Sequence, residues 1–271
     1  MTLNLLRIPY RVAMARQRDL VARRIAGEIP DLIWYLEHPP VVTWSRARGR
    51  QHLRASPEEL ERAGVALEET DRGGDVTYHA PGQLVGYPIV ALGAGREEER
   101  DLHRYLRLLE DALMDLLADL SVRAHPVPGR TGVWVAHAGT ADGGRGCAKI
   151  AALGVRVRRW VTGHGFALNI SCDLRPFRDL IVPCGLSDAR VTSLHEVLRD
   201  VQKEVQEVEE GTRDPAPTAE ALLWPLHQAL QKRLERPLGV TLDGENVFPA
   251  DKLRLTSGQP VVPWIDPTSS P

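Results

Sequence analysis

Two side chains in this sequence, Cys184 and Lys149, could carry nucleophilic or acid–base chemistry. Cys184 lies in Pro183-Cys184-Gly185, where the proline fixes the backbone before the thiol and the glycine leaves space for a substrate carbonyl. Lys149 lies in an apolar segment, so it is either an edge lysine or partly desolvated, and desolvation favours the neutral amine. A free cysteine beside an apolar run is also commonly an inert core residue. Neither residue alone decides a function.

A glycine-rich segment, residues 72–83, is the third place that could do chemistry. Gly73 and Gly74 let the backbone approach a ligand closely or adopt a positive φ, while Arg72 and His79 offer polar contacts. The alternative is a plain hairpin with glycines in its turns and a histidine at its tip. Because the histidines and cysteines form no CxxC or HxxxH pattern, we expect no metal site.

Composition and charge exclude several classes of function. The chain has 271 residues, of which 43% are hydrophobic, and its net charge of -2 does not favour nonspecific binding to nucleic acid or to anionic membranes. Its three cysteines, Cys147, Cys172 and Cys184, cannot all pair within one chain, and such sparse use is typical of a reducing compartment. Residues 3–8 are too short an apolar run for an export signal, and no stretch is long enough to span a membrane. We therefore expect a cytoplasmic protein.

The elements that must position these residues are predicted from periodicity and turn residues. We expect helices at residues 10–26 and 102–120 from the spacing of their apolar residues, which in 102–120 are mostly leucines. A helix at 56–64 is expected from the capping residue Ser56, followed by Pro57 and Glu59, and another at 224–234 with Pro225 in its first turn. Strands are expected at residues 32–36, 41–44, 75–79, 84–90, 132–135, 148–162 and 165–170, with 75–79 and 84–90 forming a hairpin. Because strands and helices cluster rather than alternate, we expect an α+β fold with a mixed sheet flanked by helices.

The chain is expected to form one domain. Residues 1–200 are predicted to be the catalytic core. Residues 201–255 extend it with a linker and a helix that belong to the same domain. Residues 256–271 are rich in proline and serine and are predicted to form a flexible tail.

Several segments together resemble the lipoyl (octanoyl) transferases of lipoate synthesis. The matching segments are residues 72–83, Gly129-Arg130-Thr131-Gly132-Val133-Trp134-Val135, Lys149-Ile150-Ala151-Ala152-Leu153-Gly154-Val155, Trp160, His164-Gly165-Phe166-Ala167-Leu168-Asn169, Asp173-Leu174, Pro183-Cys184-Gly185 and Val191-Thr192-Ser193-Leu194. A weaker match lies upstream, in Glu37-His38-Pro39-Pro40 with Thr43.

The resemblance implies a biotin- and lipoate-protein ligase-like fold and a set of site residues. It implies that Cys184 carries an acyl thioester and that Lys149 lowers the pKa of Cys184. It also implies that three segments line the substrate site, namely Arg72, Gly73, Gly74, Asp75, Val76, Thr77, Tyr78 and His79; Ala152, Leu153 and Gly154; and Gly165, Phe166 and Ala167.

The same resemblance implies the reaction and its partners. An octanoyl group would pass from octanoyl-acyl carrier protein, through the cysteine thioester, to a specific lysine of a lipoyl domain, the first step of endogenous protein lipoylation. The acceptors would be apo lipoyl domains of 2-oxoacid dehydrogenase complexes and the glycine cleavage H protein. Neither ATP, another cofactor nor a metal would be needed.

Three alternatives remain open at this point. The first is an ATP-dependent lipoate- or biotin-protein ligase of the same fold, which would leave the roles of Cys184 and Lys149 unexplained. The second is a noncatalytic protein that binds acyl groups or lipoyl domains. The third is a cysteine hydrolase that uses Cys184 with His79 or His164.

Overall fold

The structure is a computed structural model that describes residues 6–93, 97, 100–136, 146–182, 190–206, 217–238 and 247–248. Its helices are α1 (Tyr10–Ile25), α2 (Pro57–Arg62), α3 (Leu102–Asp119), α4 (Arg175–Asp179), α5 (Leu194–Gln206) and α6 (Ala219–Leu238). Its strands are β1 (Leu32–Leu36), β2 (Val41–Ser45), β3 (Ala66–Thr70), β4 (Thr77–His79), β5 (Gln83–Ile89), β6 (Ala124–Val127), β7 (Arg130–Ala136), β8 (Cys147–Arg158), β9 (Val161–Asn169), β10 (Arg190–Val191) and β11 (Val247–Phe248).

The described strands form two sheets. The larger sheet has the order β11-β1-β5-β9-β8-β7-β6, with β10 added beside β8, and the smaller one has the order β3-β2-β4. Strands β1 and β11 are parallel, as are β8 and β10, whereas the other neighbours in the larger sheet are antiparallel. The sheet is therefore mixed, and the predicted α+β class is confirmed.

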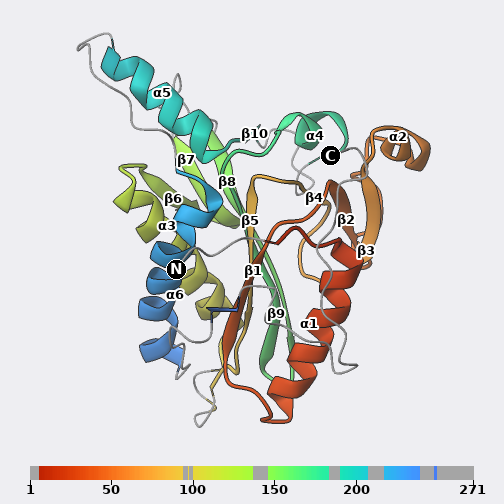
Figure 1. Cartoon of the computed structure of the whole chain (residues 1–271), viewed down its shortest axis with the longest axis vertical. Helices are drawn as coiled ribbons and strands as arrows, with labels where there is room; N and C mark the ends of the chain where they lie inside the picture. Colours follow the sequence, from red (N-terminus) through yellow and green to blue (C-terminus); the bar gives the residue numbers. More distant parts are fainter. Residues whose placement is uncertain are drawn as a thin grey trace, which may run out of the picture.

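Helices cover both faces of the larger sheet. Helix α1 contacts β9 and β5, whereas α3 contacts β6, β7 and β8 and is itself covered by α6; Figure 1 shows α1 on one side of the sheet and α3 with α6 on the other. Ile33 and Tyr35 of β1 join the core beneath α3, while Trp34 and Leu36 join the core beneath α1. Alternate side chains of a strand point to opposite faces, so a strand covered on both faces must be apolar throughout.

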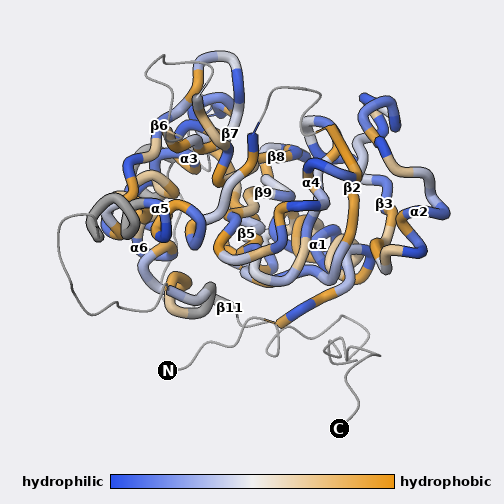
Figure 2. Tube along the Cα trace, turned by 90° about the horizontal axis from the view of Figure 1, so that it is seen from above, coloured by the Kyte–Doolittle hydropathy of each residue, from blue (hydrophilic) through white to orange (hydrophobic). Residues whose placement is uncertain are grey.

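The smaller sheet and α2 lie at the end of the molecule away from α6, as the view from above in Figure 2 shows. The start of α2 follows from its sequence. Ser56 Oγ accepts a hydrogen bond from the Glu59 N–H, the Glu59 carboxylate accepts one from the Ser56 N–H, and Pro57 occupies the first turn. The capping signal therefore predicted this helix correctly.

The hairpin predicted from residues 75–79 and 84–90 is wrong, although both strands exist. β4 pairs with β2 in the smaller sheet, whereas β5 pairs with β1 and β9 in the larger one. The turn between them carries the chain from one sheet to the other. Gly82, with φ at 82°, donates its N–H to Glu37 Oε1 and accepts hydrogen bonds from the N–H groups of Ile170 and Ser171. Contacts from distant parts of the chain thus hold the turn.

Two further boundaries differ from the prediction. The single strand expected at 148–162 is divided into β8 and β9 by a two-residue turn, in which Arg159 and Trp160 both have positive φ. Such turns usually contain asparagine and glycine, so Arg159 and Trp160 did not indicate a turn at this position. Pro225 lies inside α6, well beyond its first turn.

The described part of the C-terminal segment packs against the rest of the chain. Leu226 and Leu230 of α6 are fully buried in the core beneath α3, and Arg233 forms an ion pair with Asp115 of α3, with 2.7 Å between Nε and Oδ2. Residues 256–271, predicted to be a flexible tail, lie outside the described residues. Among the described helices, none combines the length and the apolar character needed to cross a membrane.

Candidate active site

A cavity of about 460 Å³ lies over the central strands of the larger sheet. Its walls come from β4, β5, β8 and β9, from the loop before β4, from the start of β7 and from Tyr10 of α1. The predicted site residues that line it are Arg72, Gly74, Asp75, Val76, Thr77, His79, Lys149, Ala152, Leu153, Gly154, Gly165, Phe166 and Ala167. Segments far apart in the sequence therefore meet at one cavity.

Two predicted substrate-site residues do not line the cavity. Tyr78 is buried on the other side of β4, where its ring packs edge-to-face on Phe177 at 5.5 Å, because neighbouring residues of a strand point in opposite directions. Gly73 instead donates its backbone N–H to Val155 O over 3.1 Å. It thereby holds the loop before β4 against β8.

Lys149 lies on β8 opposite Trp134 of β7, and it is only 7% exposed. Its Nζ donates a hydrogen bond to Thr131 O over 3.0 Å and lies 4.7 Å from the centre of the Trp134 ring. A carbonyl oxygen and an aromatic face both stabilise an ammonium group. Lys149 is therefore buried in the cavity wall and is not an exposed edge lysine.

The guanidinium of Arg72 ties the loop before β4 to the smaller sheet. Its Nη2 donates to Thr43 Oγ1 over 3.1 Å and to the backbone oxygens of Thr43 and Asp75. Gly154 lies beneath this loop, and a Cβ there would come within 2.8 Å of Gly73 O. Glycine at position 154 thus allows the loop to lie directly on β8.

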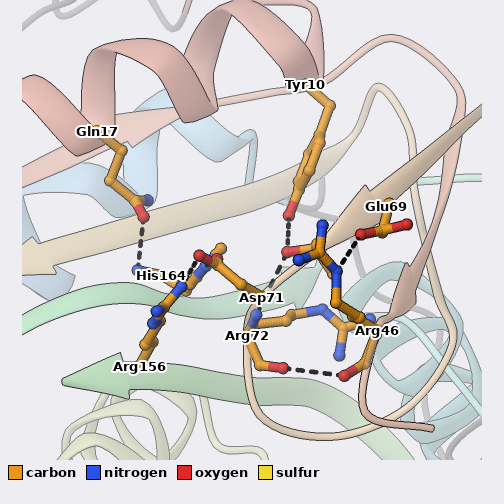
Figure 3. A network of polar contacts seen from close by, with 10 residues as sticks. Tyr10, Gln17, Arg46, Glu69, Asp71, Arg72, Arg156 and His164 are labelled. Carbon is orange, nitrogen blue, oxygen red and sulfur yellow. Dashed lines mark hydrogen bonds and ion pairs between the residues drawn. The ribbon is translucent and has the colours of Figure 1, made fainter. Parts of the chain in front are cut away.

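Two histidines of the cavity wall are held neutral. His79 Nδ1 lies 2.6 Å from Gln83 Oε1, and burial, followed by the nearby His38, lowers the pKa of His79 to about 3. His164 Nε2 lies 2.8 Å from Asp71 Oδ1, and burial, followed by the charge of Arg72, lowers the pKa of His164 to about 3. Figure 3 shows His164 and Arg156 both reaching Asp71, while Gln17 accepts the backbone N–H of His164.

Several cavity residues were not predicted from the sequence. Tyr10, His52 and Tyr87 come from three separate elements or loops, and only the fold brings them together. Thr131 lies in a segment that carried the resemblance but was given no role, and its carbonyl proves to be the partner of Lys149. Tyr10 looked like an apolar position of an expected helix, whereas its hydroxyl donates to Thr70 Oγ1 over 2.8 Å.

Cys184, with Pro183 and Gly185, lies outside the described residues, but the chain on both sides of segment 183–189 is described. On one side, the Val182 N–H donates to His52 O over 2.8 Å. On the other side, Val191 pairs with Lys149, and the Thr192 N–H donates to Lys149 O over 3.0 Å. The described residues on either side of the segment, Val182 and Val191, therefore contact two residues that line the cavity, His52 and Lys149.

Comparisons with known proteins identify relatives of this chain. The sequence model of the family described as "Lipoyl protein ligase A/B catalytic domain" matches residues 9–212. An octanoyltransferase of Acidobacterium capsulatum is 48% identical over 201 residues, which cover 72% of this chain and 80% of that protein. One of Geobacter metallireducens is 46% identical over 192 residues, covering 71% and 80% of the two chains. One of Mycobacterium avium is 49% identical over 192 residues, covering 71% and 75%.

Solved structures show the same fold at low sequence identity. Lipoate-protein ligase A bound with ATP superposes with a TM-score of 0.55 at 15% identity, covering 89% of each chain. A bipartite lipoate protein ligase from Thermoplasma acidophilum gives a TM-score of 0.54 at 15% identity, covering 88% of this chain and 84% of that one. The ligase-like fold expected from the sequence is confirmed. The chain therefore belongs to the family of the lipoyl protein ligase A/B catalytic domain and, within that family, to the octanoyltransferases.

Proposed function

We propose that this enzyme moves an octanoyl group from octanoyl-acyl carrier protein to Cys184 and then to a lysine of a lipoyl domain. One observation carries the proposal: the ammonium of Lys149 lies in the wall of the cavity, and the described residues that precede and follow the Cys184 segment, Val182 and Val191, pair with His52 and Lys149 respectively. Cys184 is the second residue after Val182, with Pro183 alone between them. The cavity volume also falls within the range of about 300–1,000 Å³ that is usual for ligand sites.

The first half of the reaction makes an acyl-enzyme. The Cys184 thiolate attacks the carbonyl carbon of the donor thioester, a new C–S bond forms, and the C–S bond to the carrier breaks. The carrier leaves as a thiol after its sulfur takes up the proton that Lys149 held. The Lys149 ammonium favours the thiolate, because an opposite charge nearby stabilises the charged form. One thioester replaces another, so the exchange is close to thermoneutral and needs no nucleotide.

The second half transfers the acyl group to nitrogen. The neutral amine of the acceptor lysine attacks the acyl-enzyme, a C–N bond forms, the C–S bond to Cys184 breaks, and the proton lost by the amine returns to the Cys184–Lys149 pair. Because His79 and His164 are neutral, they place no positive charge in the cavity wall that would repel the acceptor lysine. We assign as acceptors the apo lipoyl domains of 2-oxoacid dehydrogenase complexes and the glycine cleavage H protein. We propose that the reaction takes place in the cytoplasm, where Cys147 and Cys172 would remain free thiols.

Intact-mass measurement tests the acyl-enzyme directly. Incubation with octanoyl-acyl carrier protein is expected to add one octanoyl group, which hydroxylamine removes because it is a thioester. Cys184→Ser is expected to abolish the hydroxylamine-labile adduct, and Cys172→Ser is the matched control that keeps it. An adduct of the same lability in Cys184→Ser contradicts the proposal.

A second experiment separates the transferase from an ATP-dependent ligase. An apo lipoyl domain is supplied either with octanoyl-acyl carrier protein and EDTA, or with free octanoate and Mg-ATP. A free acid must be activated before an amine can accept its acyl group, whereas a thioester is already activated. Modification in the first mixture supports the proposal, and modification only in the second shows a ligase. Release of free octanoate without transfer would instead show a cysteine hydrolase.

A further inference from the structure

Glu110 is a buried carboxylate on α3 that lies between the helix and the sheet, with 1% of its surface exposed. Its Oε1 accepts a hydrogen bond from the Gly132 N–H over 2.8 Å, and its Oε2 lies 2.7 Å from Arg107 Nη1. Burial raises the pKa of Glu110, while the Gly132 N–H and the charge of Arg107 act in the opposite direction. One exposed arginine compensates poorly for the burial of a carboxylate, so a further interaction is expected to account for the position of Glu110.

The hydrogen bond from Gly132 leads to Lys149. The N–H of Gly132 and the carbonyl of Thr131 belong to the same peptide group, and that carbonyl accepts the hydrogen bond from Lys149 Nζ over 3.0 Å. In a trans peptide these two groups point in opposite directions. The carboxylate therefore faces the positive end of the peptide dipole, and the ammonium faces its negative end. The Glu110 carboxylate, the peptide dipole and the Lys149 ammonium therefore follow one another across β7.

Glycine at position 132 is required for this arrangement. Its φ is 134°, and a Cβ there would lie 2.9 Å from Ala151 O and 3.0 Å from Lys149 Cε. The backbone is thus turned so that its N–H reaches α3, while the lysine stem occupies the space of the missing side chain. The Trp134 ring, 4.7 Å from Nζ, lies against the same ammonium.

We infer that Glu110 is a positioning residue for Lys149, and that it acts through the peptide group between Thr131 and Gly132. Its carboxylate orients this peptide and polarises it, so that the Thr131 carbonyl holds the ammonium in the cavity wall. Hydrogen bonds in a series strengthen one another, and those that end on charged groups are stronger than neutral ones. The importance of this relay for catalysis rests on the role proposed above for Lys149.

The test compares Glu110→Gln with Asp115→Asn. Glu110→Gln keeps the size of the side chain and an oxygen that can accept from Gly132, but it removes the charge. Asp115→Asn is the matched control, because it removes a carboxylate from the same helix whose partner is Arg233 of α6 rather than the peptide at Gly132. Both variants are first compared with the wild-type enzyme by melting temperature.

The measured quantity is the rate at which N-hydroxysuccinimidyl acetate labels Lys149, read by peptide mass between pH 6 and 9. The sequence contains four lysines, and exposed Lys232 serves as the internal reference. Glu110→Gln is expected to label Lys149 roughly fivefold faster or more, because the ammonium loses charge-assisted support. Asp115→Asn is expected to leave the labelling of Lys149 unchanged.

Labelling and octanoyl transfer together distinguish the positioning role of Glu110 from the catalytic role of Lys149. The inference is overturned if Lys149 is labelled at the wild-type rate in Glu110→Gln over the whole pH range. It is also overturned if the labelling rate of Lys149 increases equally in Asp115→Asn. Faster labelling of Lys149 with an unchanged rate and pH profile of octanoyl transfer overturns the catalytic role of Lys149 and leaves the relay standing. Faster labelling with slower transfer supports both.

Discussion

His79 donates its Nδ1–H to Gln83 Oε1, 2.6 Å away, and a chain of amides fixes this direction. Asn169 Nδ2 donates to the Thr192 carbonyl, so Asn169 Oδ1 must be the atom that accepts from Gln83 Nε2. Gln83 Oε1 can then only accept, which places the proton of His79 on Nδ1. His79 therefore lines the cavity with an unprotonated Nε2, ready to accept a hydrogen bond from a substrate.

The buried histidines predict how stability depends on pH. Burial lowers the pKa of His38 to about 4, of His79 to about 3 and of His164 to about 3, from about 6.5 in the unfolded chain. Below about pH 6.5 the unfolded chain binds protons that the folded protein does not. The histidines' contribution to the free energy of unfolding is therefore complete above that pH and decreases as the pH is lowered. We expect a loss of up to about 4 kcal/mol per pH unit between pH 6 and pH 5, measured by urea unfolding.

Two variants check the source of this slope. His79→Phe removes one of the three buried histidines that titrate, so it is expected to reduce the slope of unfolding free energy against pH by about one third. His103 is exposed on α3, so His103→Gln is expected to leave the slope unchanged. A slope that is the same in wild-type enzyme and His79→Phe contradicts the assignment.

The close contact between β5 and β9 predicts a sharp difference between two neighbouring glycines. A Cβ on Gly165 would lie 2.2 Å from Gly86 O and 2.6 Å from Pro88 Cδ, so the strands would have to separate. We expect Gly165→Ala to cost about 3 kcal/mol of unfolding free energy and to slow octanoyl transfer, because Gly165 lines the cavity. Gly163→Ala is the control, since its nearest atom is the end of a side chain, Gln17 Oε1, at 3.3 Å. Equal losses in both variants would contradict this account.

Local signals in the sequence predicted most elements but not how strands pair. The leucine spacing of residues 102–120 predicted α3, and the capping residues at Ser56 predicted α2, because both signals lie within a few residues of the element itself. The hairpin at residues 75–90 was wrong because the partners of its two strands, β2 and β1, lie far upstream. Short-range spacing contains no information about such partners.

Residues that line the cavity were predicted where glycine-rich and apolar segments carried a family resemblance. The residue that we propose to act on Lys149 from outside the cavity was missed. Glu110 lies among leucines on an amphipathic helix, and its sequence context is that of an ordinary polar position. Its burial depends on a backbone N–H of β7, whose position is known only after α3 has been packed on the sheet. The resemblance gave Lys149, but not the carbonyl that holds it.

The packing of α6 on α3 predicts which of its contacts matter for stability. Leu226 is fully buried in the same core as Leu109 and Leu113 of α3, so Leu226→Ala is expected to cost about 3 kcal/mol. Arg233 is 35% exposed, and its ion pair with Asp115 is partly screened by solvent, so Arg233→Ala is expected to cost less than about 1 kcal/mol. Urea unfolding measures both values. A larger loss in Arg233→Ala than in Leu226→Ala would mean that α6 is held by charge rather than by apolar packing.

The environment of Cys172 predicts that this thiol does not react in the folded enzyme. Burial, followed by the nearby charge of Asp173, raises the pKa of Cys172 to about 12, despite a hydrogen bond that favours the thiolate. Since only the thiolate is nucleophilic, about one molecule in ten thousand is reactive at pH 8.

Cys147 lies in a more accessible environment, because it is half-buried and its Sγ lies 3.2 Å from His125 Nε2. We expect iodoacetamide at pH 8 to label Cys172 at least about a hundredfold more slowly in the folded enzyme than in urea, while Cys147 is labelled without unfolding. Peptide mass identifies each site, and rapid labelling of Cys172 in the folded enzyme would reopen the question of which cysteine accepts the octanoyl group.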